Sequence, residues 1–213
     1  MRSLLRSAAF LGLAGLCQAG VIIDKIPDLG AYWNPLKAAG GTYVYADSFV
    51  APTSGDITTL GIYLLDQSGG GDPSQFRIQL WADNGGSPDG SNVLATTDIL
   101  TDGGTSLHLS SAAVLVPVTV TAGVRYWVVG TTVGLSGTDE YKVGGHTQNS
   151  IYNDNGTFWY SNDPGGASFD GANLTPEMAI FASGDEAPEP ATWTIGALGL
   201  GALLLRRRSA SRA

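Results

Sequence analysis

The feature that most constrains the fold is an alternation of short β-prone runs with clusters of turn residues along the middle of the chain. The runs are rich in β-branched and aromatic side chains, and the clusters are rich in Gly, Asp, Asn, Ser and Pro. This spacing is typical of an antiparallel sandwich. The runs are Gly41–Val50, Ile57–Leu65, Gln75–Ala82, Val114–Thr121, Val124–Val133, Ser150–Asn153, Thr157–Ser161 and Glu177–Ala182. We therefore expect an all-β domain over residues 20–182, an antiparallel β-sandwich of jelly-roll-like type with about eight to ten strands.

Two turn sequences link neighbouring runs. Ala122-Gly123 predicts a tight turn, and Asp154-Asn155-Gly156 predicts a hairpin. Leu29–Ala39 is the one candidate for a short helix, and Pro35 weakens it.

The first 19 residues predict a secretory signal peptide. A basic start is followed by an apolar run over residues 8–16, which is too short to span a bilayer. Ala19 and Gly20 are the small residues at the expected cleavage site, with cleavage after Ala19. A buried N-terminal helix is one alternative. A lipoprotein acylated at Cys17 is another, although Leu16 stands where that signal needs a small residue.

The last 26 residues, 188–213, combine three features in order: Pro188-Glu189-Pro190, an apolar segment over residues 191–205, and the cluster Arg206, Arg207 and Arg208. As a helix the apolar segment would cover about 23 Å, which is short for a hydrocarbon core of about 30 Å. We expect a transmembrane helix over 191–205, with the arginines holding the tail in the cytoplasm. Residues 183–187 are the expected flexible linker.

Charge is distributed unevenly along the chain. Residues 20–187 hold five basic and 18 acidic residues, a net charge of −13, and the other six basic residues all lie in the two end segments. This balance excludes a nucleic-acid partner and favours solubility and association with divalent ions rather than with anionic partners. Cys17 is the only cysteine, so a chain cleaved after Ala19 has no disulfide and no thiol nucleophile.

Pro188, Glu189 and Pro190, with the apolar segment and the arginines that follow, resemble the PEP-CTERM sorting signal of Gram-negative bacteria. The resemblance implies a partner, an exosortase, which is a membrane cysteine transpeptidase that removes the tail near Pro-Glu-Pro. It also implies a bacterium that makes extracellular polysaccharide. The implied location is the outer side of the cytoplasmic membrane, and after processing the cell envelope or extracellular matrix. A plain membrane anchor that is never processed is the alternative.

Residues 76–90 and 118–129 resemble the choice-of-anchor extracellular β-domains, which precede various surface-sorting tails. The resemblance implies a β fold and a surface location. It carries over no catalytic residues.

Calcium is the most credible ion, because it prefers carboxylate, amide and carbonyl oxygens in loops. The candidate ligands are Asp83, Asn84, Asp89 and Asp154. Turn formation is the alternative reading of the same residues, because Asp and Asn cap turns. We expect no other cofactor.

Aromatic side chains are candidate sugar contacts, since sugar rings stack on indole faces. Period-two alternation places Trp81 with Arg77 and Gln79 on the face of their strand opposite Ile78. Trp159 is the second candidate. Core packing is the alternative for both residues.

Motifs for catalysis are weak. His108, expected on the solvent face of a strand, and His146, expected in a loop, lack metal-site spacing, and no G-x-S-x-G sequence occurs. Glu140 and Glu177 are the carboxylates that a glycan hydrolase would use. We expect a non-catalytic, exported surface or matrix protein. The alternatives are a carbohydrate-binding module of the exopolysaccharide matrix and a secreted glycan hydrolase.

Overall fold

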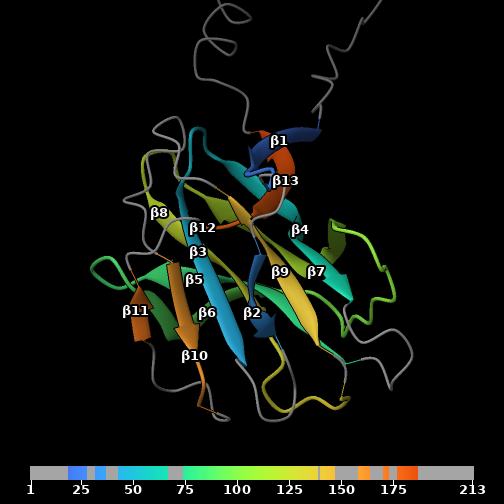
Figure 1. Cartoon of the computed structure of the whole chain (residues 1–213). Helices are drawn as coiled ribbons and strands as arrows, with labels where there is room; N and C mark the ends of the chain where they lie inside the picture. The colour runs from blue at the N-terminus through green and yellow to red at the C-terminus, as the bar shows by residue number, and fades with distance from the viewer. Residues whose placement is uncertain are drawn as a thin grey trace, which may run out of the picture. The chain divides into compact units, whose positions relative to one another are not determined.

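A computed structural model describes residues 19–27, 32–36, 43–66, 74–138, 140–146, 158–163, 170–172 and 177–186 (Figure 1). These residues contain thirteen β-strands and no helix. The strands are β1 (Ala19–Asp24), β2 (Tyr32–Leu36), β3 (Val44–Val50), β4 (Gly55–Asp66), β5 (Arg77–Asp83), β6 (Pro88–Thr96), β7 (His108–Val120), β8 (Arg125–Thr131), β9 (Tyr141–His146), β10 (Phe158–Ser161), β11 (Asp170–Ala172), β12 (Glu177–Met178) and β13 (Ile180–Glu186). Ala19–Glu186 forms one compact unit.

One sheet is built around the long strand β4. β13 and β7 occupy its two edges, because Ile62 pairs with Ile180 on one side and with Ser110 on the other. β1 pairs with the free edge of β13, and β9 pairs with the end of β4 and with β2 and β12. The sheet has seven strands, and each of these pairings is antiparallel.

The other sheet has six strands in the order β11-β10-β3-β8-β5-β6, again antiparallel throughout. β3, β8 and β5 lie side by side at its centre (Figure 1). Their register aligns Val44 with Thr131 and Thr131 with Arg77, so these three residues form one row across the sheet.

The main hydrophobic core contains side chains from both sheets. Ile57, Leu60 and Ile62 come from β4, and Phe49 and Leu80 come from the six-stranded sheet. All five side chains are fully buried. The described residues therefore form a β-sandwich-like fold, and the all-β antiparallel class expected from the sequence is confirmed.

A buried ion pair also connects the two sheets. Nζ of Lys25 lies 3.2 Å from Oδ1 of Asp47 and donates to the carbonyl of Ser48 at 2.8 Å. The backbone N–H of Lys25 donates to the carbonyl of Ile180 in β13, whereas Asp47 belongs to β3. The charges of Lys25 and Asp47 are both fully buried, so each depends on the other for compensation.

Two sequence expectations are wrong. Tyr32–Leu36, within the proposed helix Leu29–Ala39, is strand β2, which pairs with β9. The last strand continues through Ser183–Glu186, so these residues belong to the sheet and not to a flexible linker. Their weak β propensity is overridden because β13 pairs with β1 on one edge and β4 on the other.

The expected turn at Ala122-Gly123 is present but does not make a hairpin. The N–H of Val124 donates to the carbonyl of Thr121 at 3.2 Å, and Gly123 has a φ of 78°. β7 before the turn pairs with β4, whereas β8 after it pairs with β3 and β5. The turn therefore carries the chain from one sheet to the other.

The expected hairpin at Asp154-Asn155-Gly156 and its first strand, Ser150–Asn153, lie outside the described residues. Its second strand corresponds to β10, which pairs with β3 and β11.

Candidate functional site

The most distinctive surface feature is an apolar cluster on the outer face of the six-stranded sheet. Alternate residues of β3, β5 and β8 point away from the main core, and there they form a second cluster. We call this the outer-face cluster; its buried members are Val44, Ala46, Trp81, Trp127 and Val129, and Tyr43, Val133 and Trp159 pack against it. An outer sheet face normally carries polar side chains, so this composition needs an explanation.

Two tryptophans of the outer-face cluster are almost fully covered. Trp81 is 5% exposed and Trp127 is 1% exposed. The edge strand β6 runs beside Trp81, and its pairing with β5 shifts register on either side of this residue. Val93 of β6 is the residue opposite Trp81. Trp81 thus lies on the face expected from the alternation, but as a buried side chain and not as an open platform.

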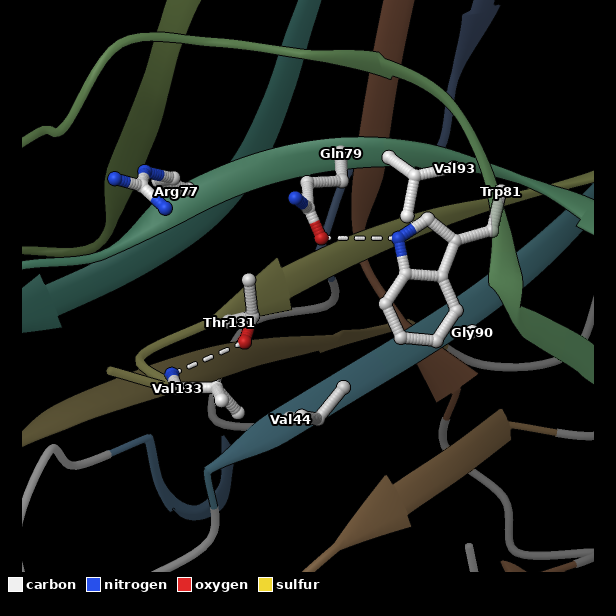
Figure 2. Close-up of a pocket in the computed structure, with 8 residues that line it drawn as sticks. All are labelled: Val44, Arg77, Gln79, Trp81, Gly90, Val93, Thr131 and Val133. Carbon is white, nitrogen blue, oxygen red and sulfur yellow. Dashed lines mark hydrogen bonds between the residues drawn. The ribbon is translucent and has the colours of Figure 1, made fainter. Parts of the chain in front are cut away.

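A pocket of about 220 Å³ lies beside Trp81 on this outer face. Figure 2 shows Arg77, Gln79 and Trp81 in sequence along β5, with Thr131, Val44 and Val133 facing them. The lining residues are Val44, Arg77, Gln79, Trp81, Gly90, Val93, Thr131 and Val133. The row of aligned residues described above, from Arg77 through Thr131 to Val44, forms part of this lining.

Hydrogen bonds fix the orientation of the polar groups in the pocket. The indole N–H of Trp81 donates to Oε1 of Gln79 at 2.9 Å (Figure 2). Because an indole nitrogen can only donate, Gln79 must present its oxygen there, and its amide nitrogen is left as a donor. That nitrogen lies 3.5 Å from Oγ1 of Thr96, a long contact. Oγ1 of Thr131 accepts the N–H of Val133 at 3.2 Å, so the Thr131 hydroxyl proton is available to donate.

Arg77 supplies a positive charge to the pocket. Its side chain is partly exposed, and within the described part of the chain it has no carboxylate partner. None of the residues that line the pocket is an Asp or a Glu. The pocket therefore combines apolar walls, one guanidinium and two further donors.

Trp159 lies outside the pocket lining and packs against the outer-face cluster. Its indole nitrogen is buried and, among the described residues, has no hydrogen-bond partner.

The candidate calcium ligands form turn contacts. Oδ1 of Asp83 accepts the indole N–H of Trp127 at 2.8 Å, and Oδ2 accepts the N–H of Gly86 at 3.1 Å. Asp89 accepts the N–H and the hydroxyl of Ser91. Asn84 is exposed and contributes its backbone to the same turn. These contacts fit the turn reading.

The fourth candidate ligand and the search for other metal-binding groups leave calcium binding untested. Asp154 lies outside the described residues. No group of three or more His, Cys, Asp or Glu that could hold a metal gathers within the described ranges.

The two histidines lie in strands. His108 begins β7, where Nε2 is 2.9 Å from Oδ2 of Asp102 and Nδ1 is 2.8 Å from the carbonyl of Ser106. The Ser106 carbonyl and the Asp102 carboxylate raise the pKa of His108 above 6.5, against a partial loss of solvation. His146 ends β9, so its expected loop position is wrong.

The residues predicted for export and sorting lie mostly outside the described part of the chain. Ala19 and Gly20 are the first residues of β1. Pro188, Glu189 and Pro190, the predicted span 191–205, and Arg206, Arg207 and Arg208 are outside it. Among the residues that the structure describes, no helix is long and apolar enough to cross a membrane.

The sequence pattern predicts only the part of the pocket that strand β5 contributes. Alternation along β5 grouped Arg77, Gln79 and Trp81 on one face, as observed. Val44, Thr131 and Val133 were missed because they come from other parts of the chain, and only the strand order β3-β8-β5 brings them there.

A scan against protein-family models finds no match, and a search of curated proteins finds no relative.

Proposed function

We propose that this chain is an exported, non-catalytic protein of the cell surface or extracellular matrix, with a jelly-roll-like sandwich as its functional body. A signal peptide over residues 1–19 directs export, and an exosortase processes the tail at Pro188-Glu189-Pro190. The observation that carries this proposal is the order of Pro-Glu-Pro, apolar segment and arginines after an acidic all-β body.

The limits of the folded body support the proposal. β1 begins at Ala19 and β13 ends at Glu186, and Ala19 pairs with Asp185. Cleavage after Ala19 would remove one residue from β1 and leave its pairs from Gly20 to Asp24 in place. Removal of the predicted leader and tail would thus keep every strand pairing between Gly20 and Glu186 that the structure describes, apart from that of Ala19.

Intact-mass analysis of the protein from its native envelope tests this proposal. We expect a chain that starts at Gly20 and lacks the residues after the Pro-Glu-Pro region. A full-length chain with both ends intact, recovered from the cytosol, would overturn export and sorting together. A chain that is cleaved at Gly20 but keeps its tail would overturn only the exosortase step and leave a plain anchor.

A second candidate function is carbohydrate binding, and the pocket beside Trp81 favours it. The pocket combines an aromatic wall, aliphatic surface and hydrogen-bond donors, which together suit the mixed apolar and polar surface of a sugar ring. The hydrolase alternative gains no support from this pocket, because neither Glu140 nor Glu177 lines it.

Affinity electrophoresis through polysaccharide gels tests carbohydrate binding. We expect Trp81→Phe to reduce retardation, because it removes the indole that fixes Gln79 and shortens the aromatic wall. Trp159→Phe is the matched control, since Trp159 does not line the pocket. Equal migration of the wild type in gels with and without polysaccharide would overturn this candidate function.

A further inference from the structure

We propose that the pocket beside Trp81 binds a carboxylate-bearing sugar, a uronic acid unit of an acidic polysaccharide. This inference rests on the carbohydrate-binding function proposed above and assigns its ligand class. It depends on three properties of the pocket: its size, the type of hydrogen bond that it has left to make, and its charge.

The size limits the ligand to about one ring. The pocket holds about 220 Å³, whereas sites for drug-sized ligands are usually about 300–1,000 Å³. Val44, Val93 and Val133 supply aliphatic surface, and Trp81 forms an aromatic wall. These surfaces match the C–H groups of a single sugar ring, with the rest of the polymer outside the pocket.

The free hydrogen-bonding groups of the pocket are donors. Arg77 has only donors. The Gln79 oxygen accepts the indole N–H of Trp81, and its amide nitrogen, which makes one long contact of 3.5 Å with Oγ1 of Thr96, keeps a second N–H for a ligand. The Thr131 hydroxyl oxygen accepts the backbone N–H of Val133, so its hydroxyl proton is free to donate to a ligand. A ligand that satisfies this set must bring acceptors, and a carboxylate brings two oxygens and no donor.

The charge of the pocket selects an anion. A guanidinium can hold a carboxylate by two parallel hydrogen bonds, which makes the contact both stronger and more specific than one with a neutral hydroxyl. No Asp or Glu lines the pocket to compete for Arg77. A neutral sugar would leave this guanidinium without a charged partner.

The net charge of the body disfavours anionic partners at long range, but it does not prevent a local contact between Arg77 and one carboxylate. The 18 acidic residues over 20–187 produce a repulsive field at long range. At physiological ionic strength this field is screened beyond about 8 Å, whereas the Arg77 contact acts at hydrogen-bond distance.

Calorimetric titration of the full chain, solubilised in a non-ionic detergent, tests the inference. The two ligands are galacturonate oligomers and the same oligomers with their carboxyl groups methyl-esterified, which removes the charge and adds one methyl group to each carboxyl. We expect the acidic oligomer to bind at least roughly tenfold more tightly than the ester. Arg77→Gln should abolish this preference, and Arg77→Lys should restore only part of it, because an ammonium makes a single-point contact.

Arg125→Gln is the matched control. It removes the same charge from the same face of the sheet, but Arg125 is the first residue of β8 and lies about 20 Å along the strand from Thr131. It should bind the acidic oligomer like the wild type. Thermal unfolding of each variant verifies that it is folded.

The possible results separate the two proposals. Equal binding of acid and ester, unchanged by Arg77→Gln, would overturn the acidic ligand and leave carbohydrate binding standing. Binding of neither oligomer, nor of any polysaccharide in the gels, would overturn both. Arg77-dependent binding of a poly-glutamate peptide, without binding of the oligomers, would overturn the sugar and identify an acidic peptide instead.

Discussion

Lys25 shows how much a single side chain can contribute to this fold. Its ammonium is completely buried between two sheets and is compensated by Asp47 and the Ser48 carbonyl. Asp47 also accepts the N–H of Ser48, so its position is fixed from two sides. The pair is a geometric link between the start of the body and the centre of the six-stranded sheet.

We predict that Lys25→Met destabilises the protein by about 3–5 kcal/mol, because it leaves the carboxylate of Asp47 buried without a counter-charge. Urea unfolding followed by tryptophan fluorescence measures the loss. The double variant Lys25→Met/Asp47→Leu should regain most of it, since the uncompensated charge is gone. A single variant as stable as the wild type would show that the pair contributes nothing net.

His108 is expected to make stability depend on pH. Its pKa is raised above 6.5 by the Ser106 carbonyl and by Asp102, so the folded state favours the protonated ring. A raised pKa contributes stability that is fully present below pH 6.5 and is lost as the pH rises through the folded-state value. The side chain is 37% exposed, which limits the contribution to less than about 1 kcal/mol.

The measurement is urea unfolding of wild type and His108→Gln at pH 5.5 and pH 8.5. We expect the variant to lose stability relative to wild type at the lower pH and to differ little at the higher pH. A difference that grows with pH would contradict the assigned direction.

Strands with alternating apolar residues could be predicted from the sequence. Strands whose sequence has weak β propensity, and which form because they pair with a neighbouring strand, could not. β4 and β5 follow the expected runs closely, because apolar residues alternate along β5 and over residues 60–64 of β4, where one face is buried. β6 begins with Pro88-Asp89-Gly90, a turn composition, and is a strand because it pairs with β5. The same holds for the pocket. The alternation along β5 predicted which of its residues share the pocket face, whereas the residues from other strands could be identified only from the strand order.

The turn between β7 and β8 depends on a glycine in the left-handed region. Gly123 has a φ of 78°, a left-handed conformation that costs roughly 1–2 kcal/mol for most other residues. Gly123→Val should therefore destabilise the protein by about that amount, and Gly123→Asn should cost less because Asn tolerates this region. No side chain stands in the way, since nothing lies within 4 Å of a Cβ at this position. Equal losses for both variants in chemical denaturation would argue against a backbone cause.

For the whole molecule, the pairing of β1 with β13 predicts where truncation begins to matter. A chain that starts at Gly20 keeps all pairs of β1 except that of Ala19, so its melting temperature should match that of the full chain. A chain that starts at Lys25 loses β1, including the buried Ile23, and exposes an edge of β13. We expect it to melt several degrees lower and to aggregate, because an open strand edge pairs with other chains.

Differential scanning fluorimetry and light scattering of the two truncated chains provide the comparison. Equal melting temperatures for the starts at Gly20 and Lys25 would contradict a structural role for β1.

The position of β13 has a consequence for how such a chain is made. β13 lies between β1 and β4, yet it consists of the last residues of the folded body. If such a polypeptide leaves a narrow translocation pore with its N-terminus first, β1 cannot pair with β13 until residues 180–186 have emerged. Pairings between segments so distant along the chain form slowly. In a chain exported in this way, the strand order would therefore postpone the pairing of β1 until the end of the folded body has emerged.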